Sequence, residues 1–366
     1  MNYRPLGAAV FAVLLVLGCA YASAQANRFL VTNDDNPAGN TATFYSLATT
    51  GTPTQLTSVA TGGLGSGGGF FAIPRTSLAR TNAGCIFVGN SGSGNVASIV
   101  ESTLTLAGVF SGGSSDSGDL GLTMAGNYLY AGFGNSLNIA TFRMNPDCTL
   151  QFLGDTAASD HPDGMKAHDG IMVVAYANGF MESFNISTGM PVANGDYQPG
   201  TGGTPAGVDL SRDGHWAVFG DATANGAVIE VSDISSGKLK TAVAYQVGTG
   251  NNSNNVRISP DQRFILVSNN NSGQVTAAFF DTTTGLISNS CTSPVLKGFA
   301  SFISGLDTTP TKGGSGFVYV ATGRNGISML RLRTNGSSCS LTEISGSPTP
   351  DPQSANLLSL STFAEY

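Results

Sequence analysis

The sequence predicts an all-β fold, a seven-bladed β-propeller with four-stranded blades. Three observations lead to this prediction: a strand motif recurs seven times, turn-forming residues are abundant, and no long window has apolar residues at helical spacing. Of the 366 residues, 49 are glycine and only 11% are charged, which is typical of short strands joined by tight turns. A two-sheet sandwich is the alternative fold, but it would not need seven equivalent units.

Each repeat begins with an apolar strand. The seven copies of this strand start near residues 28, 85, 128, 171, 215, 263 and 317. Their spacing matches the period of propeller blades. A turn rich in Gly and Asn follows each copy, then a second alternating strand, as at 275–280, and a short turn, as at 281–285. A weaker third strand comes next. An apolar strand closed by a Ser-Pro-Asp-Gly-like turn, as at 256–262, then completes four strands per repeat.

The ring must also close. Segment 354–363 has the pattern of an innermost strand, which the first repeat lacks because that repeat begins directly at 28–33. We therefore expect the C-terminal strand to pair with the N-terminal blade, which leaves no free sheet edge at the junction. The propeller then forms one domain over residues 25–366.

The N-terminal residues predict export. Arg4 precedes an apolar run at 6–17, which is too short to span a bilayer, and a small-x-small cleavage site ends at Ala24. We expect a signal peptide over residues 1–24 and a periplasmic or extracellular protein. The alternative is lipid attachment at Cys19, because the residues before it loosely resemble a lipobox.

Four cysteines remain beyond this leader: Cys85, Cys148, Cys291 and Cys339. An even number in an exported chain predicts two disulfides, and the sequence allows three pairings. We favour Cys85 with Cys148 and Cys291 with Cys339, because each of these pairs would link neighbouring repeats. The chain has no C-x-x-C motif, so a structural role is favoured over a redox role.

The composition argues against several classes of function. The net charge is −7 and no basic patch is visible, which disfavours a nucleic-acid partner. No segment after the leader has the length of a membrane helix. The three histidines are His161, His168 and His215, and the first two would lie about 20 Å apart along one strand. We therefore expect no metal centre and no cofactor, and we expect a monomer.

Residues 259–275 carry a resemblance to a known family. Their pattern, Ser-Pro-Asp-x-Arg-Phe-Ile-Leu-Val-Ser-Asn…Ser-Gly-x-Val, resembles the YVTN-type and lactonase-like seven-bladed propellers, and 212–219 is a degenerate copy. The resemblance extends over the whole mature chain as a repeat pattern. It is specific for the fold and weak for function. Its enzymatic members imply hydrolysis of a sugar-type lactone, such as 6-phosphogluconolactone, or cyclisation of muconates, with His, Arg and carboxylates at one mouth of the channel.

Asp160, His161, Pro162 and Asp163 precede an innermost strand and are the nearest match to the His-Pro element of that family. In a lactonase, His161 would be the general base on water and Asp160 would orient it. Arg257 would complete this candidate catalytic set. The alternative is a polar loop in which the proline sets a turn.

The innermost strands carry a second set of candidates. Aligning the Ser-Pro-Asp-Gly-like turns places Lys166, Asp209 and Arg257 at equivalent positions in successive blades. Asp307 would continue this series, but the sequence leaves its register ambiguous. Charges of alternating sign around the channel would either grip a polar or anionic ligand, with Arg257 as the forked donor, or form ion pairs between blades.

Asp163 and Asn254 are further candidates for ligand binding. Asn254 belongs to the asparagine-rich run 251–255, whose amides would either bind sugar hydroxyls or cap turns. We predict an exported propeller that binds a small polar or sugar-like ligand, a glycan or a protein at one mouth of its channel. The alternative is a lactone hydrolase, and whether the protein is an enzyme stays open. A phosphorylated sugar lactone is a cytoplasmic metabolite, which disfavours that substrate for an exported chain.

Overall fold

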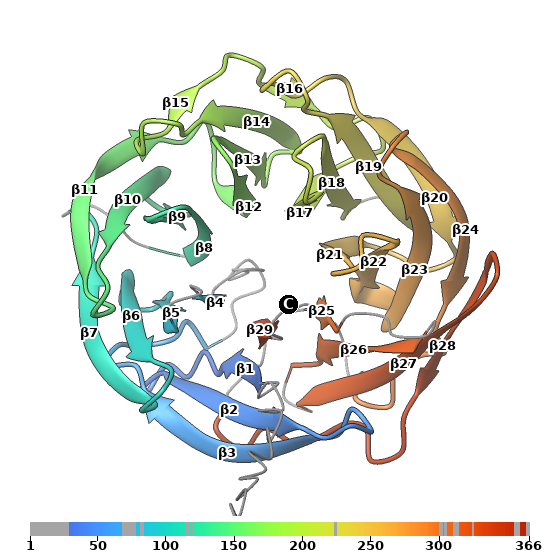
Figure 1. Cartoon of the computed structure of the whole chain (residues 1–366), viewed down its shortest axis with the longest axis horizontal. Helices are drawn as coiled ribbons and strands as arrows, with labels where there is room; N and C mark the ends of the chain where they lie inside the picture. The colour runs from blue at the N-terminus through green and yellow to red at the C-terminus, as the bar shows by residue number, and fades with distance from the viewer. Residues whose placement is uncertain are drawn as a thin grey trace, which may run out of the picture.

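Seven antiparallel sheets are arranged in a ring around a central channel (Figure 1). The computed structural model describes residues 29–67, 78–80, 84–113, 118, 120–222, 225–299, 303, 306–309, 315–323, 326–354 and 359–363. The signal peptide predicted over residues 1–24, and with it Cys19, lies outside the described residues. In the described part, no helix has the length and apolar character needed to cross a membrane.

The first three blades take up the N-terminal part of the chain. Blade 1 contains β1 (Phe29–Asn33), β2 (Thr41–Leu47), β3 (Pro53–Ala60) and β29 (Ser359–Phe363). Blade 2 contains β4 (Leu78–Arg80), β5 (Cys85–Asn90), β6 (Asn95–Val100) and β7 (Thr105–Ser111). Blade 3 contains β8 (Leu120–Ala125), β9 (Tyr128–Phe133), β10 (Asn138–Met144) and β11 (Leu150–Ala157).

Blade 4 has a divided outer strand. It contains β12 (Pro162–His168), β13 (Ile171–Tyr176), β14 (Phe180–Asn185), β15 (Val192–Ala193) and β16 (Gln198–Pro199). Both short outer strands pair with β14. Blade 5 contains β17 (Pro205–Leu210), β18 (Trp216–Asp221), β19 (Ala227–Asp233) and β20 (Val243–Gly248).

The last two blades follow the same order from the channel outward. Blade 6 contains β21 (Ser253–Ile258), β22 (Phe264–Asn269), the short 3-10 helix η1 (Asn270–Ser272), β23 (Gln274–Asp281) and β24 (Leu286–Thr292). Blade 7 contains β25 (Leu306–Thr308), β26 (Ser315–Ala321), β27 (Ile327–Asn335) and β28 (Ser338–Glu343). The predicted seven-bladed propeller is confirmed.

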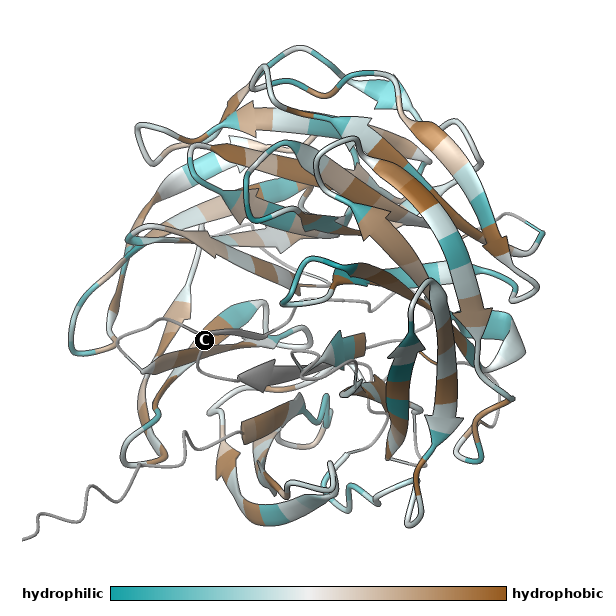
Figure 2. Ribbon diagram, turned by 45° about the vertical axis from the view of Figure 1, so that its right-hand side comes forward, coloured by the Kyte–Doolittle hydropathy of each residue, from teal (hydrophilic) through white to brown (hydrophobic). Residues whose placement is uncertain are grey.

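The second strand of a blade is apolar on both faces because both faces pack against neighbouring blades. All six residues of β5, β13 and β22 are buried. Outer strands such as β11 consist mostly of exposed and half-buried residues instead. Figure 2 shows the hydrophobic residues concentrated in the strands and the hydrophilic residues in the loops. Each pair of adjacent blades shares its own apolar cluster, so the core is divided into wedges around the ring.

Ring closure and the disulfides follow the sequence-based predictions. Strand β29 pairs antiparallel with β1, with Ser361 opposite Val31, so the C-terminal strand completes blade 1. Cys85 is bonded to Cys148, which links blades 2 and 3. Cys291 is bonded to Cys339, which links blades 6 and 7. Both predicted pairings are confirmed, and each joins neighbouring blades.

Candidate functional site

The innermost strands of a propeller run in the same direction along the channel, so their first residues gather at one mouth. We call this end the N-terminal mouth and the other end the C-terminal mouth. In blades 4, 5 and 6 the N-terminal mouth is formed where β12, β17 and β21 begin. The predicted site residues Asp160, His161, Asp163 and Asn254 all lie at this mouth.

Asp163 and Asn254 occupy the same structural position in blades 4 and 6. The register of β12 on β13 shifts between Pro162 and Gly164, and the register of β21 on β22 shifts between Ser253 and Asn255. Each shift leaves one extra residue, Asp163 or Asn254. Such bulges bend a strand and redirect a side chain, and they are common beside binding sites. The sequence did not reveal this equivalence, because one extra residue in a strand does not visibly change the repeating pattern of apolar residues.

The bulged strands approach one another so closely that glycine is required at two contacts. A Cβ atom on Gly164 would lie 2.3 Å from the main-chain oxygen of Ala206 in the next blade. A Cβ atom on Gly207 would lie 2.8 Å from the main-chain oxygen of Asn254 one blade further on. The backbones of blades 4, 5 and 6 are therefore in direct contact at the N-terminal mouth, which fixes the relative positions of Asp163 and Asn254.

Asn254 holds an unsatisfied acceptor at this mouth. Asn254 is only 4% exposed to solvent. The side-chain Nδ2 donates a long hydrogen bond of 3.4 Å to Oδ1 of Asn252. Its own Oδ1 is buried and accepts no hydrogen bond from the described residues. Burying a polar atom without a partner is unfavourable by roughly 1–3 kcal/mol, so Asn254 marks a position where a ligand donor would be stabilised.

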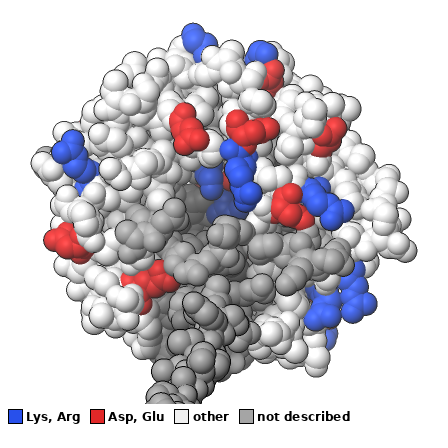
Figure 3. All heavy atoms as spheres, viewed as in Figure 1, with Lys and Arg blue, Asp and Glu red and all other residues white. Residues whose placement is uncertain are grey.

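The charged series lies deeper along the same strands. Lys166, Asp209, Arg257 and Asp307 pair with equivalent residues of their second strands, Val173, Val218, Leu266 and Tyr319. This register resolves the position of Asp307, which the sequence had left ambiguous. Figure 3 shows acidic and basic side chains close together around the hollow at the centre of one face.

Asp209 connects three blades. Its Oδ1 lies 3.2 Å from Nζ of Lys166 in blade 4, and its Oδ2 accepts a 2.9 Å hydrogen bond from the main-chain N of Ile258 in blade 6. The Asp209 side chain is 8% exposed, whereas that of Lys166 is 36% exposed. The predicted ion pair between blades therefore exists for Lys166 and Asp209, and the lysine still reaches solvent.

His161 is wedged between blades 3 and 4. A Cβ atom on Gly134, in the turn after β9, would lie 2.2 Å from Nε2 of His161, so the imidazole occupies the space that a side chain would need. Asp160 accepts a 2.7 Å hydrogen bond from the main-chain N of His161 through Oδ1, and a 2.9 Å bond from Asn178 through Oδ2. Arg257 belongs to blade 6 and lies at the deeper level of the charged series. The three candidate catalytic residues thus come from two separate parts of the channel.

A buried pair of carboxyl groups at the junction of blades 7 and 1 was not predicted as a unit. Asp34 follows β1, and Asp351 lies in the segment before β29. The Thr32 hydroxyl is 2.6 Å from Oδ1 of Asp34 and 2.9 Å from Oδ2 of Asp351. The Thr41 and Thr43 hydroxyls donate to Oδ2 of Asp34. Burial, together with the charge of Asp351, raises the pKa of Asp34 to about 7.

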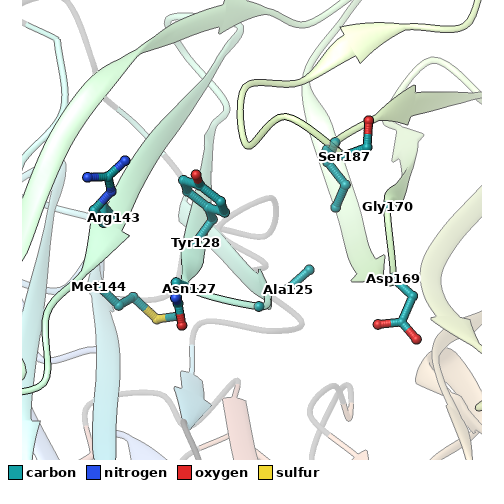
Figure 4. Close-up of a pocket in the computed structure, with 10 residues that line it drawn as sticks. Ala125, Asn127, Tyr128, Arg143, Met144, Asp169, Gly170 and Ser187 are labelled. Atoms are coloured by element: carbon teal, nitrogen blue, oxygen red, sulfur yellow. The ribbon is translucent and has the colours of Figure 1, made fainter.

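A pocket of about 480 Å³ lies between blades 3 and 4 on the side of the C-terminal mouth. Figure 4 shows Arg143 and Tyr128 on one side of this pocket and Asp169 and Ser187 on the other. No sequence motif marks this pocket, because its walls are formed by strand ends and short turns. Among the described residues, no three His, Cys, Asp or Glu side chains are grouped so as to hold a metal ion.

Comparisons with known proteins establish the fold. No protein family model and no curated protein sequence matches this chain. A putative 6-phosphogluconolactonase from Bacteroides fragilis is 14% identical and aligns over 93% of this chain and 98% of its own, with a TM-score of 0.70. A protein of unknown function from Desulfotomaculum acetoxidans is 14% identical over 93% of this chain and 100% of its own, with a TM-score of 0.67. A periplasmic gluconolactonase from Pseudomonas aeruginosa is 20% identical over 72% of this chain and 81% of its own, with a TM-score of 0.55. The structural neighbours thus include lactonase-type propellers, while the narrower YVTN-type resemblance stays a prediction.

Proposed function

We propose that this protein binds a small polar, sugar-like ligand at the N-terminal mouth of its channel. The observation that carries this proposal is the buried, unpaired Oδ1 of Asn254 on a bulge that matches the bulge of Asp163. A ligand hydroxyl would satisfy the Asn254 acceptor, and Asp163 would accept a second hydroxyl hydrogen bond from the same level of the channel. Small-molecule sites commonly combine a fixed cavity with a few such convergent polar groups.

The charged series would add a second set of contacts. Lys166 is exposed enough to reach a ligand while its partner Asp209 stays fixed by the main chain of blade 6. Arg257 would provide forked donors for a carboxylate or a ring oxygen. A neutral or weakly acidic sugar derivative suits this arrangement best, because the cations are partly compensated by Asp209 and Asp307.

We also propose that the protein acts outside the cytoplasm. Two disulfides link neighbouring blades, and such bonds form and persist in oxidising compartments. The predicted signal peptide over residues 1–24 supports the same location. A ligand of the cell surface or the periplasm is therefore favoured over a cytoplasmic metabolite.

Calorimetric titration tests the binding proposal. The mature protein would be titrated with monosaccharides, aldonates and aldonolactones. For the compound that binds, Asn254→Ala should weaken the affinity at least about fivefold, because about 1–3 kcal/mol of hydrogen bonding is removed. Asn251→Ala is the matched control, since Asn251 lies in the loop just before β21 and is exposed. A folded protein that binds none of these compounds, or an Asn254→Ala variant with unchanged affinity, would contradict the proposal.

A second candidate is a lactone hydrolase. It is favoured by the fold similarity to proteins described as a 6-phosphogluconolactonase and a periplasmic gluconolactonase. In this alternative His161 would activate water, Asp160 would assist it and Arg257 would bind the lactone carbonyl. The hydrogen bond of Asp160 to the main chain of His161 disfavours this role. Acid release from a lactone that is lost in both His161→Ala and Arg257→Ala would support the hydrolase.

A further inference from the structure

A second pocket, which we call the arginine pocket, lies at the outer part of the junction between blades 7 and 1. Its volume is about 540 Å³. Arg331 and Arg333 of β27 form one wall, and Thr50 and Thr52, in the turn after β2, form another. Figure 3 shows basic side chains gathered at the lower right of the molecule, in the region of β27 and β28.

The two arginines present their charges to one space. They are two residues apart on one strand, so they lie on the same face of the sheet, about 7 Å apart at their Cα atoms. The Arg331 guanidinium carbon lies 5.0 Å from the centre of the Phe317 ring, which orients the side chain. Its Nε is buried and donates no hydrogen bond to the described residues. Within the described chain neither arginine forms an ion pair with a carboxylate.

One carboxylate also lines this pocket. Glu343 is held by two bonds: Oε1 accepts from the Ser347 hydroxyl at 2.6 Å, and Oε2 accepts from the main-chain N of Lys297 at 3.1 Å. Its negative charge therefore opposes two arginine charges, and the pocket keeps a net positive charge. Such a site is unusual in a chain whose net charge is −7.

The opposite wall is held rigidly. The Tyr319 hydroxyl of blade 7 donates a 2.8 Å hydrogen bond to the main-chain oxygen of Gly51. Gly51 has a φ of +89°, and a Cβ atom there would lie 2.3 Å from the Phe317 ring, so the turn needs glycine and packs directly on blade 7. The hydroxyls of Thr50 and Thr52 are 3.3 Å apart. The turn thus fixes two hydroxyl groups at the edge of a site that contains two guanidiniums.

We propose that the arginine pocket binds a tetrahedral oxyanion, either free phosphate or sulfate or the same group as an ester on a sugar. Guanidinium groups match the geometry of such oxyanions through forked, charge-assisted hydrogen bonds, and threonine hydroxyls donate to the remaining oxygens. A bound anion would also compensate the charge of Arg331, which is half-buried and forms no ion pair with a described carboxylate. This site shares no residue with the N-terminal mouth.

Calorimetric titrations at constant ionic strength test this proposal. The probes are inorganic phosphate, inorganic sulfate and glucose 6-sulfate, with chloride as the background anion. We expect one saturable site, and at least a tenfold loss of affinity in Arg331→Gln and in Arg333→Gln. Arg263→Gln is the matched control, because Arg263 is exposed and lies 5.7 Å from the Phe264 ring but does not line the arginine pocket. Thermal unfolding verifies that each variant is folded, and Arg333→Gln changes only an exposed side chain.

The outcomes are distinct. Tighter binding of glucose 6-sulfate than of sulfate identifies an ester as the ligand, and equal affinities identify the free ion. No saturable binding to the folded wild type overturns the proposal, as does equal binding by the two variants and the wild type. Asn254→Ala should leave oxyanion binding unchanged, so failure at this pocket and failure at the channel mouth are separable.

Discussion

Blades 4 to 6 and the junction of blades 7 and 1 are held together by different kinds of contact. In blades 4 to 6 the backbones of the innermost strands touch at Gly164 and Gly207. At the junction, the two ends of the described chain meet through strand pairing and a buried pair of carboxyl groups, Asp34 and Asp351. Close packing occurs in both regions, but in blades 4 to 6 it joins the innermost strands of different blades backbone to backbone, and the junction adds a polar pair whose protonation responds to pH.

The disulfides are distributed unequally between these regions. They link blades 2 and 3 and blades 6 and 7, whereas the described interfaces between blades 4, 5 and 6 have none. The disulfides thus lie between the two regions, one on each side of the ring. The candidate binding region is built by backbone contact within one continuous stretch of chain, and ring closure depends on pairing between the two ends of the described chain.

Removing a disulfide should produce the largest effect. The bonds close loops of 63 and 48 residues, and the chain-entropy model assigns each about 4 kcal/mol of stability. Chemical denaturation should show that the free energy of unfolding falls by this amount in the double variant Cys85→Ala/Cys148→Ala and in the double variant Cys291→Ala/Cys339→Ala. Hydrogen exchange should increase first in blades 6 and 7 for the second pair, because Cys291 and Cys339 link these two blades. Equal increases in blades 4 and 5 would contradict the distinction between the two regions.

Gly164→Ala should destabilise the protein by about 2–3 kcal/mol, because the new Cβ atom would press on the main chain of Ala206 and force the inner strands apart. The shift in denaturation midpoint measures this loss. Gly39→Ala is the control, because nothing lies within 4 Å of a Cβ atom there. If both substitutions had the same effect, the channel contacts would not be as close as described.

The carboxyl pair should make stability depend on pH. Burial and Asp351 raise the pKa of Asp34 from 3.8 to about 7, so between these values the folded protein keeps a proton that the unfolded chain has lost. Stability should therefore fall as pH rises from about 4 to 7, by up to about 1.4 kcal/mol per pH unit from this group. Denaturation at several pH values measures how the free energy of unfolding changes with pH, and Asp34→Asn should make this dependence weaker. The same pH dependence in the variant would show that Asp34 does not cause it.

The sequence predicted the features that repeat and missed those that depend on single residues. The seven strand motifs, the closing strand and both cysteine pairings follow from period and composition. Lys166, Asp209 and Arg257 were aligned because each precedes a similar turn. The equivalence of Asp163 and Asn254 was missed because a bulge adds one residue without changing the pattern of apolar residues.

Contacts across the junction were also missed, for a different reason. Asp34 meets Asp351, and Arg331 lines a pocket with Thr52, only because ring closure brings distant parts of the chain together. The sequence predicted that the C-terminal strand closes the ring, but it did not indicate which side chains come into contact there. The roles of Asp160, His161 and Arg257 stay predictions, since their placement alone does not establish chemistry.

Acid release from a panel of aldonolactones and aromatic lactones, measured in weak buffer beside the binding titrations, separates a binding protein from a hydrolase. If the protein is a binding protein, we expect one compound to bind the wild type, to bind Asn254→Ala more weakly, and to give no turnover above background. Turnover that both His161→Ala and Arg257→Ala abolish would contradict a binding protein and establish a lactone hydrolase at the channel.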